Sequence, residues 1–191
     1  MNRLSLLVPA VASLAVFAQS PTPTGPLAKD QGETRASGRI EVKSPAMKAG
    51  AEIPSKYSAY ADDVSPPLQW SRVADAKSYA LIVEDPDARS TRPFVHWSAW
   101  NIPAATAGLP EGVKEAPYGA RQGKNGQGAS GYFGPRPPAG DPDHHYHFQV
   151  FALDTTLDVP ADADRDQLVE AMKGHVLAKG ELVALYKPPK G

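Results

Sequence analysis

The stretch Gly131–Leu153, GYFGPRPPAGDPDHHYHFQVFAL, joins a loop rich in glycine and proline to an apolar run that is typical of a strand. Three of the chain's five histidines, His144, His145 and His147, lie within four residues at this junction. Successive side chains of a strand point to opposite faces, so His144 and Tyr146 share one face and the other two histidines share the second. The stretch therefore predicts a strand that carries polar side chains towards a pocket at its start.

A second polar segment begins where another apolar run ends. Residues 78–84, SYALIVE, predict a buried strand that ends at Asp85-Pro86-Asp87. The aromatic-rich run 93–102 predicts the next strand and contains His96. Side-chain alternation is expected to place three further residues on the face of His96, namely Phe94, Ser98 and Trp100.

The two segments together predict one pocket. Its walls would carry His96, His144 and Tyr146, while Asp85 and Asp87 would close its mouth. Imidazole, phenol and carboxylate groups supply hydrogen-bond donors and acceptors but no evident nucleophile. A turn that merely ends a strand is the alternative interpretation of Asp-Pro-Asp taken by itself.

The order of these motifs resembles the phosphatidylethanolamine-binding protein family, which includes the Raf kinase inhibitor proteins and the bacterial YbhB/YbcL branch. The matching motifs are DPDA at 85–88, the His96 strand ending at Asn101, GP-x-PP-x-G followed by H-x-Y, and SPPLQW at 65–70. The resemblance covers residues 39–188. It implies a β-sandwich with a few peripheral helices.

The resemblance also implies an anion pocket. Its residues in this chain would be Asp85, Asp87, His96, Gly134, His144 and Tyr146. Gly134 would let backbone N–H groups approach a bound anion closely. The chain departs from the family at three places: His145 stands where the family often has Arg, Arg89 where eukaryotic members commonly have Pro, and Arg136 where they have a second Gly. We therefore expect an intact pocket with an altered rim, which affects ligand preference.

A metal site is the main rival interpretation. The three clustered histidines, together with His96 and Asp85, suggest a three-histidine site with a carboxylate. Strand alternation argues against it, because His144 points away from His145 and His147. We therefore expect neither a metal nor a cofactor.

Enzymatic activity is not expected either. Ser130 lies outside any G-x-S-x-G motif, and no strand-to-helix turn follows it. Asp85 and Asp87 are too close in sequence to flank a sugar reliably, as glycosidase carboxylates do. Cysteine is absent, which excludes thiol catalysis, disulfides and thiolate metal sites.

The first residues are typical of an export signal. Arg3 gives a positive start, residues 4–18 are almost entirely apolar or small, and Val16-Phe17-Ala18 is a tolerable cleavage site. We therefore divide the chain into a signal peptide at 1–18, a flexible Pro/Thr/Gly-rich linker at 19–38 and a ligand-binding domain at 39–191. The exported protein would be periplasmic or secreted; an uncleaved membrane anchor is the alternative.

One helix is expected late in the chain. Asp164 and Gln167 form a capping-box pattern, apolar residues follow at helical spacing up to Val176, and Lys179-Gly180 is expected to end the helix before a last strand at 181–187. The chain shows no regular alternation of strands and helices. It therefore predicts a mainly antiparallel sheet or sandwich.

The overall charge narrows the class of partner. The formal net charge is −1 and no Lys/Arg-rich run is present, so nucleic acid is not an expected ligand. We expect an exported, non-enzymatic protein that binds a small anionic ligand, either a phosphoryl compound or a phospholipid head group. The alternatives are an inhibitor of a kinase or protease that acts by protein contact and, second, a metal-dependent enzyme. The oligomeric state stays open.

Overall fold

The computed structural model describes residues 25–190. The predicted signal peptide, 1–18, and the first residues of the predicted linker lie outside this range. Within the range, no helix is long and apolar enough to cross a membrane.

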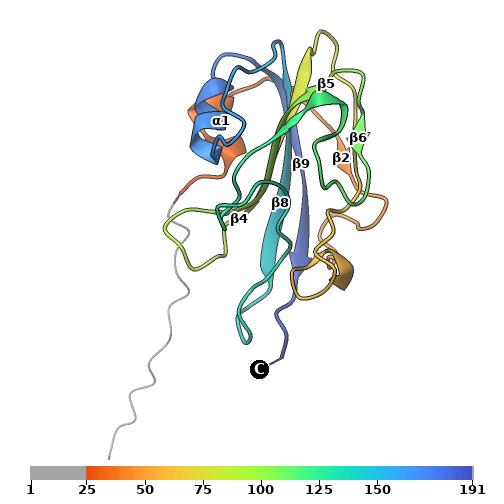
Figure 1. Cartoon of the computed structure of the whole chain (residues 1–191), viewed down its shortest axis with the longest axis vertical. Coiled ribbons are helices and arrows are strands. Elements are labelled where there is room, and N and C mark those ends of the chain that lie inside the picture. Colours follow the sequence, from red (N-terminus) through yellow and green to blue (C-terminus); the bar gives the residue numbers. More distant parts are fainter. Residues whose placement is uncertain (1–24, 191) are drawn as a thin grey trace, which may run out of the picture.

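Two sheets make up most of the fold (Figure 1). The larger has six strands in the order β1-β9-β8-β4-β5-β7, and its neighbouring strands are antiparallel except for the β1–β9 pair. These strands are β1 Gly38–Arg39, β4 Ser78–Asp85, β5 Phe94–Pro103, β7 Arg121–Gln122, β8 His144–Leu153 and β9 Val176–Tyr186. The smaller antiparallel sheet, β2-β3-β6, consists of Val42–Lys43, Leu68–Trp70 and Gly108–Leu109. The prediction of a mainly antiparallel β fold is confirmed.

Helical segments are short and peripheral. The helix α1 spans Arg165–Ala171, and four 3₁₀ turns lie at Ala28–Asp30 (η1), Gly32–Thr34 (η2), Ser55–Tyr57 (η3) and Pro117–Gly119 (η4). The small sheet lies on one side of the large sheet, and α1 lies on the other with η1 and η2 (Figure 1).

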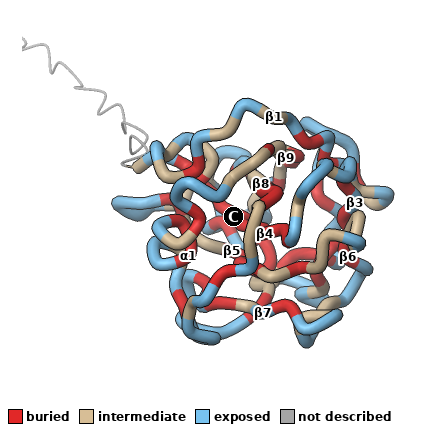
Figure 2. The backbone as a smooth tube through the Cα atoms, turned by 90° about the horizontal axis from the view of Figure 1, so that it is seen from above, coloured by how far each residue is buried: buried red, intermediate tan, exposed pale blue. Residues whose placement is uncertain are grey.

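Both faces of the large sheet are buried, and residues that are buried in Figure 2 follow its central strands. Alternate residues of β4 enter two separate apolar clusters: Leu81 packs towards the small sheet, and Ile82 packs under α1 beside Leu168. This explains why SYALIVE is apolar without alternation, since a strand covered on both faces has no solvent side.

The helix α1 begins where the sequence predicts. Asp164 accepts a hydrogen bond from the Gln167 backbone N–H, and the Gln167 side chain accepts one from the Asp164 N–H, which completes the capping box. The predicted end at Lys179-Gly180 is wrong, because the helix stops at Ala171. Gly174 adopts a positive φ of 79° there, and Val176 then starts β9.

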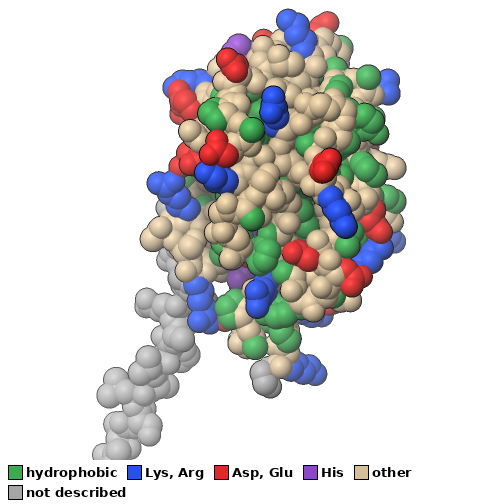
Figure 3. Space-filling view, viewed as in Figure 1, with side chains coloured by type: hydrophobic (Ala, Val, Ile, Leu, Met, Phe, Trp, Pro, Cys, Tyr) green, Lys and Arg blue, Asp and Glu red, His purple; other side chains and the backbone are tan. Residues whose placement is uncertain are grey.

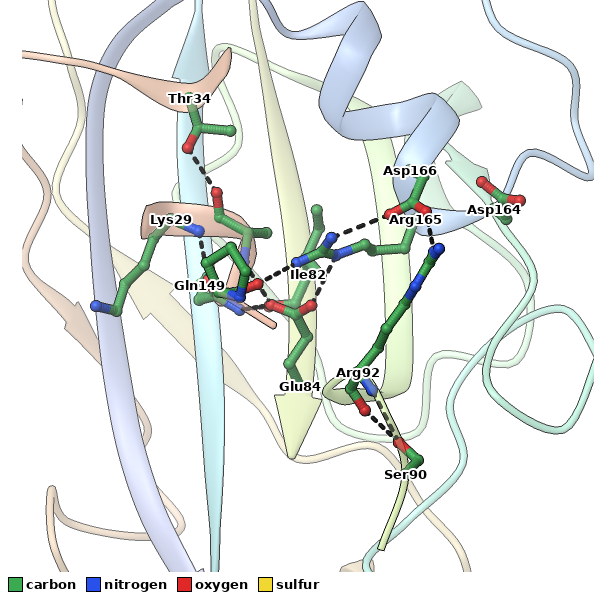
Figure 4. A network of polar contacts seen from close by, with 12 residues as sticks. Lys29, Thr34, Ile82, Glu84, Ser90, Arg92, Gln149, Asp164, Arg165 and Asp166 are labelled. Carbon is green, nitrogen blue, oxygen red and sulfur yellow. Dashed lines mark hydrogen bonds and ion pairs between the residues drawn. The ribbon is translucent and has the colours of Figure 1, made fainter. Parts of the chain in front are cut away.

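The segment from Ala28 to Thr34, expected within a flexible linker, is docked on the large sheet instead. Ala28 and Thr34 are fully buried. The Ala28 N–H donates to the Glu84 carboxylate at 2.7 Å, and the Lys29 N–H donates to the Gln149 side chain at 2.8 Å (Figure 4). The expected linker therefore differs from the structure in this part. We call residues 25–35 the N-terminal segment.

Candidate functional site

A cavity of about 130 Å³ lies at the end of the large sheet where β4 stops and β8 starts. This is the lower end of the molecule in Figure 1. Its polar lining comprises Asp85, Arg89, His96, Gln127, Arg136, His144 and Tyr146. Four of the six residues predicted for the site therefore line this one cavity, and these four come from β4, β5 and β8.

Alternation along β8 separates the histidines as predicted. His144 and Tyr146 are buried, with 3 % and 1 % exposure. On the other face, His145 is exposed and its Nδ1 lies 2.8 Å from the Asp87 carboxylate. The Nδ1 of His147 lies 2.8 Å from Glu181. Neither histidine on this second face lines the cavity.

A β-bulge places His96 in the cavity. Val83 pairs with Trp97 while Glu84 pairs with Val95, so His96 is an extra residue in β5 without a partner in β4. The prediction that His96 shares a face with Ser98 and Trp100 is therefore wrong, because the extra residue reverses the alternation after His96. Its expected neighbours Ser98 and Trp100 lie on the opposite side of the sheet: Ser98 pairs with Ile82 and Trp100 packs in the cluster under α1.

His96 presents an acceptor to the cavity. Its Nδ1 lies 2.6 Å from the Phe133 backbone carbonyl, which only accepts hydrogen bonds, so Nδ1 carries the proton. Burial lowers the pKa of His96 and outweighs the raising effects of the Phe133 carbonyl and the Asp85 charge. The ring is therefore neutral, and Nε2 is left with a free lone pair.

The pKa of His144 is shifted in the opposite direction. Its Nδ1 lies 2.7 Å from Asp85 Oδ2, and its Nε2 lies 3.6 Å from Asp141 Oδ2. Burial by itself lowers the pKa of His144, but the hydrogen bond to Asp85 and the charges of Asp85, Asp87 and Asp141 together raise it above its usual value. Of the two cavity histidines, His144 is therefore the one whose charged form is favoured.

The Tyr146 hydroxyl is buried without a hydrogen-bond partner among residues 25–190. Its ring meets the His96 ring edge to face, with centroids 5.0 Å apart. Burial raises the pKa of Tyr146, and the charge of Asp85 adds to this effect. The Asp85 carboxylate lies near the hydroxyl, but the contact does not have the geometry of a hydrogen bond, so the phenol stays protonated and without a partner. An O–H group without a partner at a cavity wall is available to a ligand.

Gly134 and Asp87, also predicted for the site, do not line the cavity. The Gly134 N–H donates to Asp63 Oδ1 at 2.6 Å, so it is not free for an anion. A side chain at position 134 would come within 2.3 Å of the Tyr57 carbonyl oxygen, which explains why glycine is needed. Asp87 accepts a hydrogen bond from the His145 N–H at 2.8 Å and is directed to the outer face.

Sequence reasoning named the two rim arginines and placed Phe94 on the face of His96, but it missed Asp141 and Phe133. Arg89 pairs with Asp141, whose side chain is only 3 % exposed. Phe94 and Phe133 line the cavity beside the His96 ring, with centroids 4.8 and 5.9 Å from it. An aspartate three residues before a predicted pocket histidine was the available signal for Asp141.

No group of three or more His, Cys, Asp or Glu side chains within residues 25–190 is arranged to hold a metal ion. His144 instead lies between two buried carboxylates, Asp85 at 2.7 Å and Asp141 at 3.6 Å, and His96 is bound to a backbone carbonyl.

Comparison with known proteins agrees with this architecture. Residues 43–187 match the family model described as phosphatidylethanolamine-binding protein. A UPF0098 protein from Pyrococcus horikoshii is 48 % identical over 141 residues, covering 71 % of this chain and 70 % of the relative. A UPF0098 protein from Methanothermobacter thermautotrophicus is 43 % identical over 152 residues, covering 78 % of this chain and 99 % of the relative.

Two crystal structures are similar in fold and sequence. YbcL of E. coli, described as a member of the mammalian PEBP family, has a TM-score of 0.75 and 31 % identity, and the match covers 80 % of this chain and 100 % of YbcL. A phosphatidylethanolamine-binding protein homologue from Chlamydia trachomatis has a TM-score of 0.73 and 39 % identity, with the same coverage. The chain therefore belongs to the phosphatidylethanolamine-binding protein family.

Proposed function

We propose that this protein binds a small anionic ligand through a phosphoryl group in the cavity between β4, β5 and β8. The observation that carries the proposal is the buried Tyr146 hydroxyl, which has no partner among the described residues and lies in the same cavity as the charged His144. A buried polar group without a partner costs free energy. A ligand oxygen would supply the missing hydrogen bond.

The rim supports an anionic ligand as well. Arg136 lines the cavity and has no carboxylate partner within residues 25–190. Its planar guanidinium can donate two parallel hydrogen bonds to a phosphoryl group. A cavity of about 130 Å³ suits a small group rather than a large ligand. On the face in Figure 3, acidic and basic side chains are interspersed, which is unlike the extended basic surface that a polyanion needs.

The lining of the cavity favours binding without chemistry. The described residues that line it include no serine, threonine, cysteine or lysine. The raised pKa of Tyr146 opposes its use as a nucleophile, and His144 is held by Asp85. We therefore propose a non-enzymatic binding protein.

Calorimetric titration with inorganic phosphate tests the proposal. The wild-type protein is expected to bind one phosphate saturably, and Tyr146→Phe is expected to weaken that binding. Absence of binding at millimolar phosphate would refute the proposal. The phosphoryl group could belong to a free small molecule or to a phospholipid head group. Flotation with vesicles of phosphatidylethanolamine and phosphatidylglycerol distinguishes the two, because only a protein that binds lipid head groups would float with the vesicles.

We further propose that the protein is exported, on the evidence of Arg3, the apolar run 4–18 and the cleavage sequence Val16-Phe17-Ala18. N-terminal sequencing of the protein from its producing cell is expected to begin near Gln19. Recovery of intact Met1 in the membrane fraction would favour a retained anchor instead.

A further inference from the structure

The cavity offers an anion one acceptor as well as donors. Because the Nδ1–H of His96 is bound to the Phe133 carbonyl at 2.6 Å, Nε2 is the nitrogen left for the cavity, and it has no proton when the ring is neutral. A ligand oxygen that faces Nε2 must therefore bring a hydrogen. A fully ionised oxygen at this place would meet a lone pair.

A carboxylate already stands beside the charged histidine. Asp141 lies 3.6 Å from His144 Nε2, the nitrogen that is not bound to Asp85. The Asp141 side chain is 3 % exposed and forms an ion pair with Arg89, which lines the cavity. This ion pair joins the loop after β4 to the loop before β8. The positive charge of His144 is thus balanced on both sides before any ligand enters.

The charges around the cavity leave room for one negative charge on the ligand. Asp85 and Asp141 are balanced by His144 and Arg89, which leaves Arg136 as the unpaired cation among the described residues that line the cavity. Asp87 adds a further negative charge on the outer side, where it pairs with His145. A monoanion would be balanced by Arg136, whereas the second charge of a dianion would have no counter-ion in the cavity, and a buried charge without a counter-ion is costly.

We propose that the cavity selects an anion that carries its own acidic proton, such as dihydrogen phosphate or a singly protonated phosphomonoester, and that His96 and Asp141 determine this selectivity. The proposal rests on the proposed function. The P–OH group would donate to His96 Nε2, while the P–O⁻ and P=O oxygens would accept from Tyr146, His144 and Arg136. Sulfate has nearly the same shape but no proton at neutral pH, and a phosphodiester has no P–OH group.

The alternative is that His96 itself takes up a proton when the ligand binds. His96 would then donate, and sulfate would serve as well as phosphate. Burial among Phe94, Phe133 and Tyr146 opposes this, and the charge of His144 adds to the opposition. The hydrogen bond to the Phe133 carbonyl and the charges of Asp85 and Asp63 favour it. Burial is the largest of these effects and keeps the ring neutral.

The test is calorimetric titration at pH 6.0 of the full chain with four probes: inorganic phosphate, methyl phosphate, dimethyl phosphate and sulfate. A phosphomonoester has its second pKa near ~6, so about half of it carries a proton at this pH. Phosphate and methyl phosphate are expected to bind at least about tenfold more tightly than sulfate and dimethyl phosphate, because an unpaired buried acceptor costs about a factor of ten or more.

The variant Asp141→Asn removes one negative charge and keeps the shape. The repulsion that Asp141 exerts on a ligand scales with the ligand's charge. If the affinity for monoanionic phosphate rises about threefold, the affinity for dianionic sulfate should rise about ninefold, so the preference for phosphate is expected to fall about threefold. Asp143→Asn is the matched control, because Asp143 lies on the same loop and is exposed. It is expected to leave the preference unchanged.

The outcomes separate the two proposals. If none of the four probes binds, the proposed function fails. If phosphate binds but sulfate or dimethyl phosphate binds equally well, the anion site stands and the selectivity proposal is overturned. If the preference exists but is the same in Asp141→Asn as in the wild type, Asp141 is not one of its determinants.

Discussion

Glu84 and Asp85 are consecutive residues of β4, and their carboxylates serve opposite faces of the same sheet. Glu84 accepts hydrogen bonds from the Ala28 N–H at 2.7 Å and from Arg165 Nε at 2.8 Å, beneath the N-terminal segment (Figure 4). Asp85 holds His144 at 2.7 Å on the side of the cavity. One strand end therefore supports both the docking of the N-terminal segment and the charge of the cavity.

We predict that Glu84→Gln lowers the free energy of unfolding by about 3 kcal/mol, since it leaves the largely buried Arg165 without its buried counter-ion. Phosphate affinity should change less than about threefold, because the replaced group lies on the other face. Urea unfolding measures the first effect and calorimetry the second. Arg92→Gln is the control, because its ion pair with Asp166 is exposed and should be worth less than about 1 kcal/mol. Equal losses in both variants would contradict the prediction.

Tyr146→Phe is expected to separate binding from stability. The change removes a buried hydroxyl that has no partner among the described residues, so the ligand-free protein should gain about 1 kcal/mol of stability. Phosphate affinity should fall about tenfold, because the ligand loses one donor. Thermal unfolding and titration on the same samples check both directions. A variant that loses stability would show that the hydroxyl has a protein partner.

His144→Ala should weaken phosphate binding about ten- to a hundredfold, because it removes a charge-assisted donor. His145→Ala should change the affinity less than about threefold, since His145 is exposed on the other face and pairs with Asp87. Calorimetric titration compares the two. If His145→Ala lowers the phosphate affinity as much as His144→Ala does, the assignment of His145 to the outer face of β8 is wrong.

Affinity for phosphate should rise as the pH falls from about 8 towards 6. The raised pKa of His144 keeps it charged over the lower part of this range, and the ligand gains the proton that His96 requires. Protons should therefore be taken up on binding, which titrations in two buffers of different ionisation enthalpy measure. Below about pH 5 the trend should reverse as carboxylates protonate. A flat profile without proton uptake would remove the basis for a protonated ligand.

The two cavity histidines should have opposite effects on stability. The pKa of His96 is lowered in the fold, so the unfolded chain binds more protons below about 6.5 and stability falls as the pH drops. The pKa of His144 is raised, so its contribution is complete below about 6.5 and is lost as the pH rises through the folded value. We predict that His96→Asn loses less stability than the wild type between pH 7 and pH 5, as followed by urea unfolding. If the variant and the wild type lose the same amount of unfolding free energy between pH 7 and pH 5, His96 is not buried in its neutral form.

Local patterns predicted the elements that rest on local chemistry. The strand His144–Leu153 lies in the stretch where a strand is predicted, and α1 starts at Arg165, directly after the predicted cap Asp164. Side-chain alternation and a capping box are both encoded by neighbours in sequence. The faces of His144 and His145 follow from the same alternation. The end of α1 was missed because Val176 fits a helical spacing as well as it fits a strand, and its pairing with Leu153 is a long-range contact.

Features that depend on distant partners were not predictable in this way. The bulge at His96 arises from the pairing of β5 with β4, and nothing in the run FVHWSAW marks an extra residue. The contacts of the N-terminal segment with Glu84 and Gln149 are made by its main chain. Its side-chain composition, which is largely polar, therefore does not reveal that the segment is docked on the sheet. The sequence of β4 does contain a signal for this contact: Glu84 ends the apolar run SYALIVE, and a buried glutamate requires a polar partner.

The aromatic surroundings of His96 have a spectroscopic consequence. The Phe133 ring is nearly parallel to the imidazole at 10°, and the Phe94 and Tyr146 rings are inclined to it at 54° and 71°. Ring currents from three neighbours must displace the proton resonances of this imidazole from those of the chain's four other histidines. His96 is therefore a built-in chemical-shift reporter, whose Hε1 signal follows the occupancy of the cavity without a label.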